Sequence, residues 1–263
     1  MKIACNYSPE LMKLLDAGEV EIDYIKLALY PEFMGKFDPE KTDFPILVHG
    51  INPGSPERIG VWPPSDFDWE GLNKRFKKYK TPHLGVHLDM HQGDIPEFDE
   101  EKIIKRLIEG AKKWQEKIDL PFLLENVPCS YFYCRRGVLS QVGDPEIITK
   151  VCLEAGTGFL LDLAHARVTA FWKNMSPWEY IKKLPLHLMR EIHLNSPLFT
   201  EEGLRDKHLE LNEEDYELLQ KILSCFPVEI LTLEYGGPGE KFKGRSEKEA
   251  IYRQVNKLRE LVE

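Results

Sequence analysis

The chain has 263 residues, of which 42% are hydrophobic and 11% aromatic, so it can bury a substantial core and is not an intrinsically disordered protein. Its formal net charge of −9 disfavours a protein that coats nucleic acid, although it leaves room for a local basic groove. The N-terminal residues lead into no long apolar run, and no stretch is long enough to span a bilayer, so we expect a cytoplasmic protein without a membrane segment.

Short segments rich in β-branched, aromatic and leucine residues recur along the whole chain and are typical of buried strands. Several of them end at a polar or ionisable residue, and Gly-Gly follows the last one. In chain order, the expected strands are Lys2 to Cys5, Ile22 to Leu29, Pro45 to His49, Leu84 to Leu88, Pro121 to Glu125, Gly158 to Leu163, Arg190 to Leu194 and Val228 to Glu234.

Segments with helical periodicity lie between these strands. The clearest is Asp99 to Ile118, where apolar residues recur at helical spacing and three acidic residues at its start complement the positive end of the helix dipole. The other expected helices are Ser8 to Gly18, Glu70 to Tyr79, Asp144 to Ala155, Ser176 to Leu184, Asn212 to Leu223 and Ser246 to Val262.

Strands that alternate with helices about eight times predict a parallel sheet. Eight units favour a closed (β/α)8 TIM barrel, the α/β fold whose usual length is roughly 250 residues. An open doubly wound sheet is the alternative, but the first strand is not followed by the Gly-x-Gly-x-x-Gly of a dinucleotide site. Because we find no linker or break in composition, we interpret residues 1–263 as one domain.

Cysteine usage points to free thiols. The number of cysteines is odd, they are scattered, and no secretion signal accompanies them: Cys5, Cys129, Cys134, Cys152 and Cys225. A redox or zinc-binding pair of Cys129 and Cys134 is the alternative reading.

Ionisable residues stand at the ends of six successive expected strands, each roughly 30 to 40 residues, or one strand–helix unit, beyond the last. In a barrel these ends converge on one face, where active sites form. His165 adds a group three residues after one of them, and Asp206 and His208 add two from the loop after the seventh strand. The nine candidate ligands are His49, His87, Glu125, Asp162, His165, His193, Asp206, His208 and Glu234.

Nine such groups predict a multinuclear metal centre. Carboxylates packed together repel one another, and divalent cations remove that conflict without protonating them. Four or five ligands satisfy one ion, so the set predicts two or three divalent ions with bridging carboxylates. The ligand types suit iron, zinc and manganese alike.

Four further residues are assigned to substrate binding. Asn126 and Asn195 follow closely on the candidate ligands Glu125 and His193. Arg135 and Arg136 lie with aromatic residues in the loop after the fifth strand, where they suit a peptide or a phosphate, or form an ordinary surface loop.

The ligand series resembles the xylose-isomerase-like superfamily of metal-dependent barrels, and within it the multinuclear non-haem iron-dependent oxidases. The similar segments are His49-Gly50-Ile51, His87-Leu88, Leu124-Glu125-Asn126-Val127, Leu161-Asp162-Leu163, Ile192-His193-Leu194 and Asp206-Lys207-His208. This resemblance implies two or three irons, dioxygen activation and a cysteine-containing peptide as substrate, with its thiolate bound to iron.

Endonuclease IV uses the same order of residue types, and His165 and His193-Leu194-Asn195 resemble it more than they resemble the oxidases. However, the chain begins Ala4-Cys5-Asn6-Tyr7 instead of a His-Val-Ser segment and has no basic stripe for DNA. We therefore expect an oxidase. The alternatives are a phosphodiester hydrolase, a sugar isomerase or epimerase, for which the set is rich in histidine, and a metal-binding or partner-binding barrel without activity.

Overall fold

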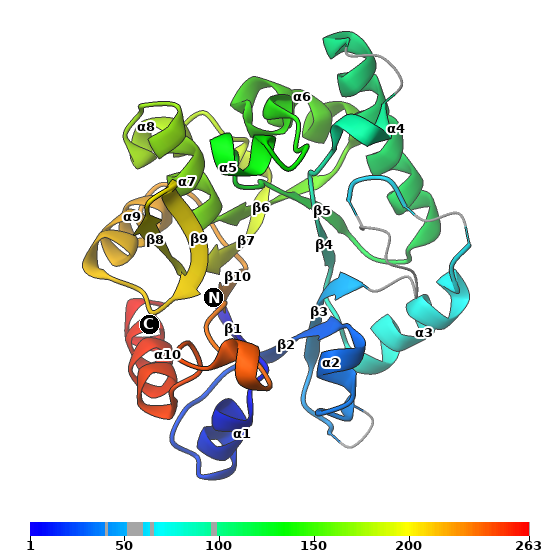
Figure 1. Ribbon diagram of the computed structural model, residues 1–263. Coiled ribbons are helices and arrows are strands. Elements are labelled where there is room, and N and C mark those ends of the chain that lie inside the picture. Colours follow the sequence, from blue (N-terminus) through cyan, green and yellow to red (C-terminus); the bar gives the residue numbers. More distant parts are fainter. Residues whose placement is uncertain (40–41, 52–59, 64–65, 96–98, 263) are drawn as a thin grey trace.

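The computed structural model describes residues 1–39, 42–51, 60–63, 66–95 and 99–262. Eight parallel strands form a closed barrel in the order β1-β10-β7-β6-β5-β4-β3-β2, with helices around the outside (Figure 1). The strands are β1 (Lys2–Asn6), β2 (Tyr24–Leu29), β3 (Ile46–Ile51), β4 (Leu84–His87), β5 (Phe122–Glu125), β6 (Gly158–Asp162), β7 (Met189–Leu194) and β10 (Ile230–Leu233). The TIM barrel predicted from the sequence is confirmed, and all eight predicted strands are present.

Several helices begin at side chains that cap their first turns. Ser8 accepts a hydrogen bond from the Leu11 amide, and Asp99 accepts one from Lys102 at the start of the longest helix. The helices are α1 (Pro9–Asp16), α2 (Pro31–Met34), α3 (Trp69–Tyr79), α4 (Glu100–Lys117), α5 (Tyr131–Cys134), α6 (Pro145–Ala155), α7 (Leu163–Trp172), α8 (Pro177–Ile181), α9 (Glu213–Leu223) and α10 (Lys248–Val262).

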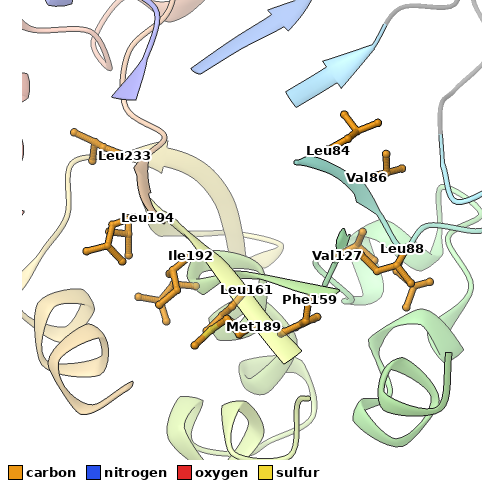
Figure 2. Close-up of a cluster of buried hydrophobic side chains, with 14 of the residues drawn as sticks. Leu84, Val86, Leu88, Val127, Phe159, Leu161, Met189, Ile192, Leu194 and Leu233 are labelled. Carbon is orange, nitrogen blue, oxygen red and sulfur yellow. The ribbon is translucent and has the colours of Figure 1, made fainter. Parts of the chain in front are cut away.

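Alternation along each strand divides the apolar core from the polar interior of the barrel. On β7, Ile192 and Leu194 point outward to the helices, together with Leu161 of β6 (Figure 2). The side chains between them, Glu191 and His193, are also buried. β7 therefore places apolar residues under the helices and ionisable residues inside the barrel, whereas Ala4, Tyr24, Leu47 and Ile230 form a separate buried apolar cluster.

Two elements near the mouth differ from the sequence-based expectation. The sixth strand was expected to continue to Leu163, but the chain turns into α7 directly after Asp162. The segment from Asn195 to His208 was expected to be a polar loop, but it forms an antiparallel hairpin of β8 (Ser196–Thr200) and β9 (Gly203–Leu209). In addition, the expected loop after β5 contains the short helix α5.

All five cysteines are free thiols, as predicted. Among the described residues, no helix combines the length and apolarity that a membrane crossing requires. Because β1 pairs with β10, the two ends of the chain close the same barrel, and we propose on this basis that the chain is one domain.

Candidate metal centre

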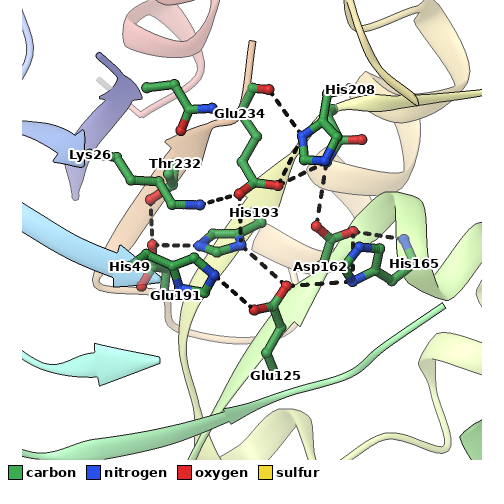
Figure 3. Close-up of polar contacts among 12 residues, drawn as sticks. Lys26, His49, Glu125, Asp162, His165, Glu191, His193, His208, Thr232 and Glu234 are labelled. Atoms are coloured by element: carbon green, nitrogen blue, oxygen red, sulfur yellow. Dashed lines mark hydrogen bonds and ion pairs between the residues drawn. The ribbon is translucent and has the colours of Figure 1, made fainter. Parts of the chain in front are cut away.

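The nine candidate ligands lie together at the C-terminal end of the barrel. Five come from the ends of β3 to β7, Glu234 directly follows β10, His165 belongs to α7, and Asp206 and His208 belong to β9. Figure 3 shows the side chains of His49, Glu125, Asp162, His165, His193, His208 and Glu234 gathered together. Most of them line a cavity of about 330 Å³, whereas Asp162 and His193 lie beneath it and are fully buried. The predicted convergence of strand ends therefore occurs in the structure.

Glu125 lies at the centre of the group. Its Oε2 atom is 3.3 Å from Nε2 of both His49 and His87, and its Oε1 atom is 3.5 Å from Nδ1 of His193. Oε2 has no hydrogen-bond partner although Glu125 is only 1% exposed. Two ligands that each lie about 2.1 Å from one tetrahedral ion are about 3.4 Å apart, so each of these histidine–glutamate spacings fits a pair of ligands on one cation.

A second group of candidate ligands includes His193, whose Nδ1 atom lies near Oε1 of Glu125. Asp162, His193 and Glu234 each offer a ligand atom within 4.8 Å of one another, and all three residues are buried. The Asn195 amide spans two of the carboxylates, because its Nδ2 atom is 3.4 Å from Oδ2 of Asp162 and 3.1 Å from Oε2 of Glu234. Asn195 thereby fixes the separation of two candidate ligands.

A third group surrounds Asp206. Its Oδ2 atom is 3.0 Å from Nε2 of His208 and 3.5 Å from Nε2 of His165. Asp206 and His208 lie two residues apart on β9, as the Asp-x-His spacing predicted. His208 has a φ angle of 51°, in the left-handed region that residues other than glycine rarely adopt, and such backbone strain often occurs at functional sites.

The second ring nitrogen of three histidines is held by another group. Nδ1 of His165 is 2.9 Å from the Asn126 carbonyl oxygen, and Nδ1 of His208 is 3.3 Å from that of Glu234. Nε2 of His193 is 3.1 Å from the Glu191 carboxylate. Such contacts fix the ring orientation, so His165 and His208 present Nε2 to the centre and His193 presents Nδ1.

Three residues of the site were missed in the sequence. Glu191 accepts from Thr232 and lies 2.5 Å from Nε2 of His83, so it connects His83 to His193 inside the barrel. Lys26 of β2 is buried and forms an ion pair with Glu234. Glu191 and Lys26 lie on barrel strands, and only the closed barrel reveals that both point inward.

The charges of the metal-free cluster perturb its protonation. Burial raises the pKa of Asp162 to about 7, although the charge of His165 opposes the increase. Burial and the Lys26 ammonium lower the pKa of His193, but the surrounding carboxylates Glu234, Glu191 and Glu125 raise it to about 10. The metal-free cluster therefore holds protons that compete with cations for the same atoms.

The four residues assigned to substrate binding have other contacts. Asn126 is fully buried and exchanges two hydrogen bonds with the backbone of Asp162, and Asn195 bridges carboxylates as described. Arg135 forms an ion pair with Glu202 and contacts the Tyr131 ring, and Arg136 lies 3.8 Å from the centroid of Phe132. Neither arginine lines the cavity, and the substrate-binding assignment of all four stays a prediction.

The sequence profile of the family described as "RiPP precursor modification enzyme MbnB/TglH/ChrH" matches residues 36–242. Among curated proteins, a UPF0276 protein from Rhizobium meliloti (strain 1021) is 27% identical over 165 residues, which cover 59% of this chain and 50% of that protein. A UPF0276 protein from Paraburkholderia phytofirmans is 32% identical over 162 residues, or 57% and 49% of the two chains. The chain thus spans about half the length of these relatives.

Solved structures with a similar fold share few identical residues with the chain. An IolI protein with a bound zinc atom has a TM-score of 0.60 and 14% identity, over 100% of this chain and 98% of that one. An AP endonuclease, family 2, from Brucella melitensis has a TM-score of 0.57 and 15% identity, over 92% and 96%. An L-ribulose 3-epimerase has a TM-score of 0.58 and 13% identity, over 99% and 93%. At these identities the structures show the TIM-barrel fold alone and leave the reaction open.

Proposed function

The chain belongs to the MbnB/TglH/ChrH family of RiPP precursor modification enzymes, a family of metal-dependent enzymes, and from this premise we propose that it is an oxygen-dependent oxidase of a cysteine-containing peptide. In this reaction the peptide donates electrons and dioxygen accepts them. Membership of this family supports a peptide as the substrate. The observation that carries the proposal is the buried Glu125, whose two oxygens face histidines on both sides while one of them lacks a hydrogen-bond partner.

The orphaned polar atoms fit cation binding. Oε2 of Glu125 and Nδ1 of His193 are both buried, and neither has a hydrogen-bond partner in the part of the chain that the structure describes. Leaving such atoms without a partner is unfavourable by roughly 1–3 kcal/mol each, and more for a charged group. A divalent ion bound at each atom would satisfy it.

The open ring nitrogens divide the ligands into three sets, and we propose one ion for each. His193 has one open nitrogen, so it can serve a single ion, and the contact of His165 with the Asn126 carbonyl directs its Nε2 toward Asp206. The sets are His49 and His87 with one oxygen of Glu125; Asp162, His193 and Glu234 with the other; and Asp206 with His165 and His208.

Bound iron would supply a site for the peptide thiolate and the electrons that activate dioxygen. The protein's own groups hold this arrangement. The Asn195 amide separates two carboxylates, and Glu191 orients the His193 ring. Lys26 lies against Glu234 in the cavity wall, where its ammonium favours a substrate that arrives with negative charge.

Metal content and oxygen uptake together test the proposal. We expect freshly purified protein to contain two or three irons per chain, and to consume dioxygen with a cysteine peptide but not with the matching serine peptide. Glu125→Gln should lose metal and activity together, whereas Glu229→Gln on the surface should retain both. Zinc as the sole metal, with no oxygen uptake by iron-reconstituted protein on any thiol peptide, would contradict the oxidase.

A phosphodiester hydrolase is the second candidate. It is favoured by His165, which with Asp206 and His208 completes a third ligand set, and three ions can clamp a phosphate and activate water. Zinc-loaded or manganese-loaded protein would then cleave a duplex with an abasic site at low salt. Intact duplex after incubation with metal-replete protein would remove this candidate.

A further inference from the structure

The cavity has a second wall that the metal centre does not use. Besides the candidate ligands, aromatic and cationic side chains line it: Tyr30, Phe33, Lys241, Phe242 and Arg245. The last three follow β10, in the orange segment beside the barrel mouth in Figure 1. The rings of Phe33 and Phe242 meet edge to face with centroids 5.6 Å apart, which gives this wall a defined apolar surface.

Arg245 is a cation of this wall that contacts the segment carrying two candidate ligands. Its guanidinium donates to the carbonyl oxygen of Lys207 at 3.4 Å and lies 4.7 Å from the centroid of the Phe242 ring. Lys207 stands between Asp206 and His208, so the guanidinium borders one of the proposed ligand sets. Within the described part of the chain, no carboxylate forms an ion pair with Arg245.

The surroundings of Arg245 favour a counter-ion from outside the protein. The side chain is half-buried, and burial lowers its pKa although Asp206 and Glu234 act in the opposite direction. A partly desolvated guanidinium is stabilised by a carboxylate that it can bind through two parallel hydrogen bonds. The Lys207 carbonyl accepts only one of the hydrogen bonds that the Arg245 guanidinium can donate.

Loading with metal increases this demand for an anion. The four carboxylates among the candidate ligands are Glu125, Asp162, Asp206 and Glu234, and two divalent ions already neutralise them. The ammonium of Lys26 and the guanidinium of Arg245 then remain as positive charges on the cavity wall. A third divalent ion would increase this excess of positive charge. A substrate that binds here is favoured if it has an anionic group besides its thiolate.

We propose that Arg245 forms a substrate subsite that binds a carboxylate, so that the preferred thiol has a carboxylate close to its sulfur. This inference rests on the proposed function for the thiol itself. The carboxylate can belong to the reacting cysteine, as a free C-terminus, or to an acidic residue beside it. Phe242, which stacks under the guanidinium, holds the subsite in place.

Small thiols that differ only in this charge provide the test. Cobalt-loaded protein is titrated without oxygen, with N-acetylcysteine and N-acetylcysteinamide, and the thiolate-to-cobalt charge-transfer band reports binding. A second pair, acetyl-Cys-Glu-amide and acetyl-Cys-Gln-amide, tests a side-chain carboxylate. We expect about tenfold tighter binding of the acid in at least one pair, equivalent to about 1.4 kcal/mol. The pair that shows the preference identifies the source of the carboxylate.

Substitutions assign the preference to Arg245. Arg245→Met should bind acid and amide equally, and Arg245→Lys should retain part of the preference because the charge remains. Arg253→Met removes an exposed arginine that pairs with Glu210 and should leave the preference unchanged. Cobalt content and circular dichroism confirm that each variant is folded and loaded. If Arg245→Met fails to fold, the subsite is tested by the two thiol pairs on wild-type protein and by Arg245→Lys.

The outcomes separate this subsite from the proposed function. If wild-type protein binds both members of each pair equally, the subsite is wrong while thiol binding stands. If Arg245→Met keeps the full preference, another residue binds the carboxylate. If metal-replete protein shows no thiolate band with any probe, the peptide oxidase itself fails, and the subsite fails with it.

Discussion

At the scale of single residues, the orientation of His193 depends on a carboxylate that is not a candidate ligand. Glu191 holds Nε2 of His193 at 3.1 Å, and it is itself held by His83 and Thr232 at 2.5 Å each. Glu191 and His83 are 1% and 0% exposed, so this chain of contacts has no access to water. We interpret Glu191 as a positioning residue that presents Nδ1 of His193 to the centre.

Glu191→Gln should weaken metal binding without removing a ligand. The neutral amide holds the imidazole less strongly, and loss of such a contact typically lowers metal affinity by about 10- to 100-fold. Competition with a chelating dye measures the affinity, and thermal unfolding of the metal-free variant measures the purely structural effect. Glu229→Gln, at an exposed pair with Arg190, is the control and should change neither. Metal affinity within twofold of the wild type would show that Glu191 only packs the barrel.

The buried thiols should be chemically silent in the native protein. Burial raises the pKa of Cys5 and of Cys152 to about 12, so at pH 8 roughly one thiol in ten thousand is present as the reactive thiolate. Cys225 is exposed and should react with Ellman's reagent within minutes, whereas Cys5 and Cys152 should react only in denaturant. Cys225→Ser identifies the fast thiol. Labelling of Cys152 in native protein, located by mass spectrometry, would contradict the buried environment.

The candidate ligands could be predicted because they recur at the ends of successive strands, where the fold brings them together. Glu191, Lys26 and His83 could not be predicted in the same way. A glutamate or lysine within a strand usually faces water, and only the closure of the barrel reveals that these positions point inward. Their roles depend on partners from other strands, such as Lys26 with Glu234, which sequence spacing does not indicate.

At the scale of elements, β4 has a glycine at which an added side chain would meet two neighbouring side chains. A Cβ atom at Gly85 would lie 2.6 Å from Cδ1 of Leu160 and 3.3 Å from Nδ1 of His49. The absent side chain therefore leaves the space that the His49 ring requires. This glycine connects the packing of β4 to the position of a candidate ligand on β3.

Gly85→Ala should destabilise the barrel and disturb the ligand set of His49. Overpacking of this kind typically costs about 1–3 kcal/mol, because Leu160 and the His49 ring must shift. Urea unfolding of metal-free protein gives the loss of stability, and metal analysis gives the loss of bound ions. Gly93→Ala is the matched control, since nothing lies within 4 Å of a Cβ there. Unchanged stability and metal content in Gly85→Ala would refute the steric argument.

The elements that the sequence did not predict are those that deliver ligands from outside the barrel strands. Helix α7 is buried almost all round, so it lacks the alternation of polar and apolar faces that identifies a surface helix. It begins where Asp162 accepts a hydrogen bond from the His165 amide, which links a cap to two candidate ligands. The β8–β9 hairpin contains many polar residues and therefore has the composition of a loop.

At the scale of the whole molecule, the barrel concentrates negative charge at one end of its axis. The candidate ligands include four carboxylates, and three of these, Glu125, Asp162 and Glu234, are buried. Lys26 pairs with Glu234, and burial raises the pKa of Asp162 to about 7, so a proton on Asp162 competes with metal binding. Assembly of the fold therefore creates a cluster whose repulsion a cation relieves, which couples metal binding to stability.

Removal of metal should lower the stability of the entire barrel. A ligand present at 100 times its Kd stabilises the folded state by about 2.7 kcal/mol, which corresponds to roughly 5 to 10 °C in Tm for a chain of this size. Differential scanning calorimetry of the purified protein, with and without a chelator, measures the shift. Glu125→Gln lacks the ligand shared by two proposed sets, so its Tm should respond less to the chelator than that of the wild type. If metal analysis shows complete removal and the wild-type Tm is unchanged, the cations do not relieve the repulsion within the cluster, and the centre would be a rigid site that forms without them.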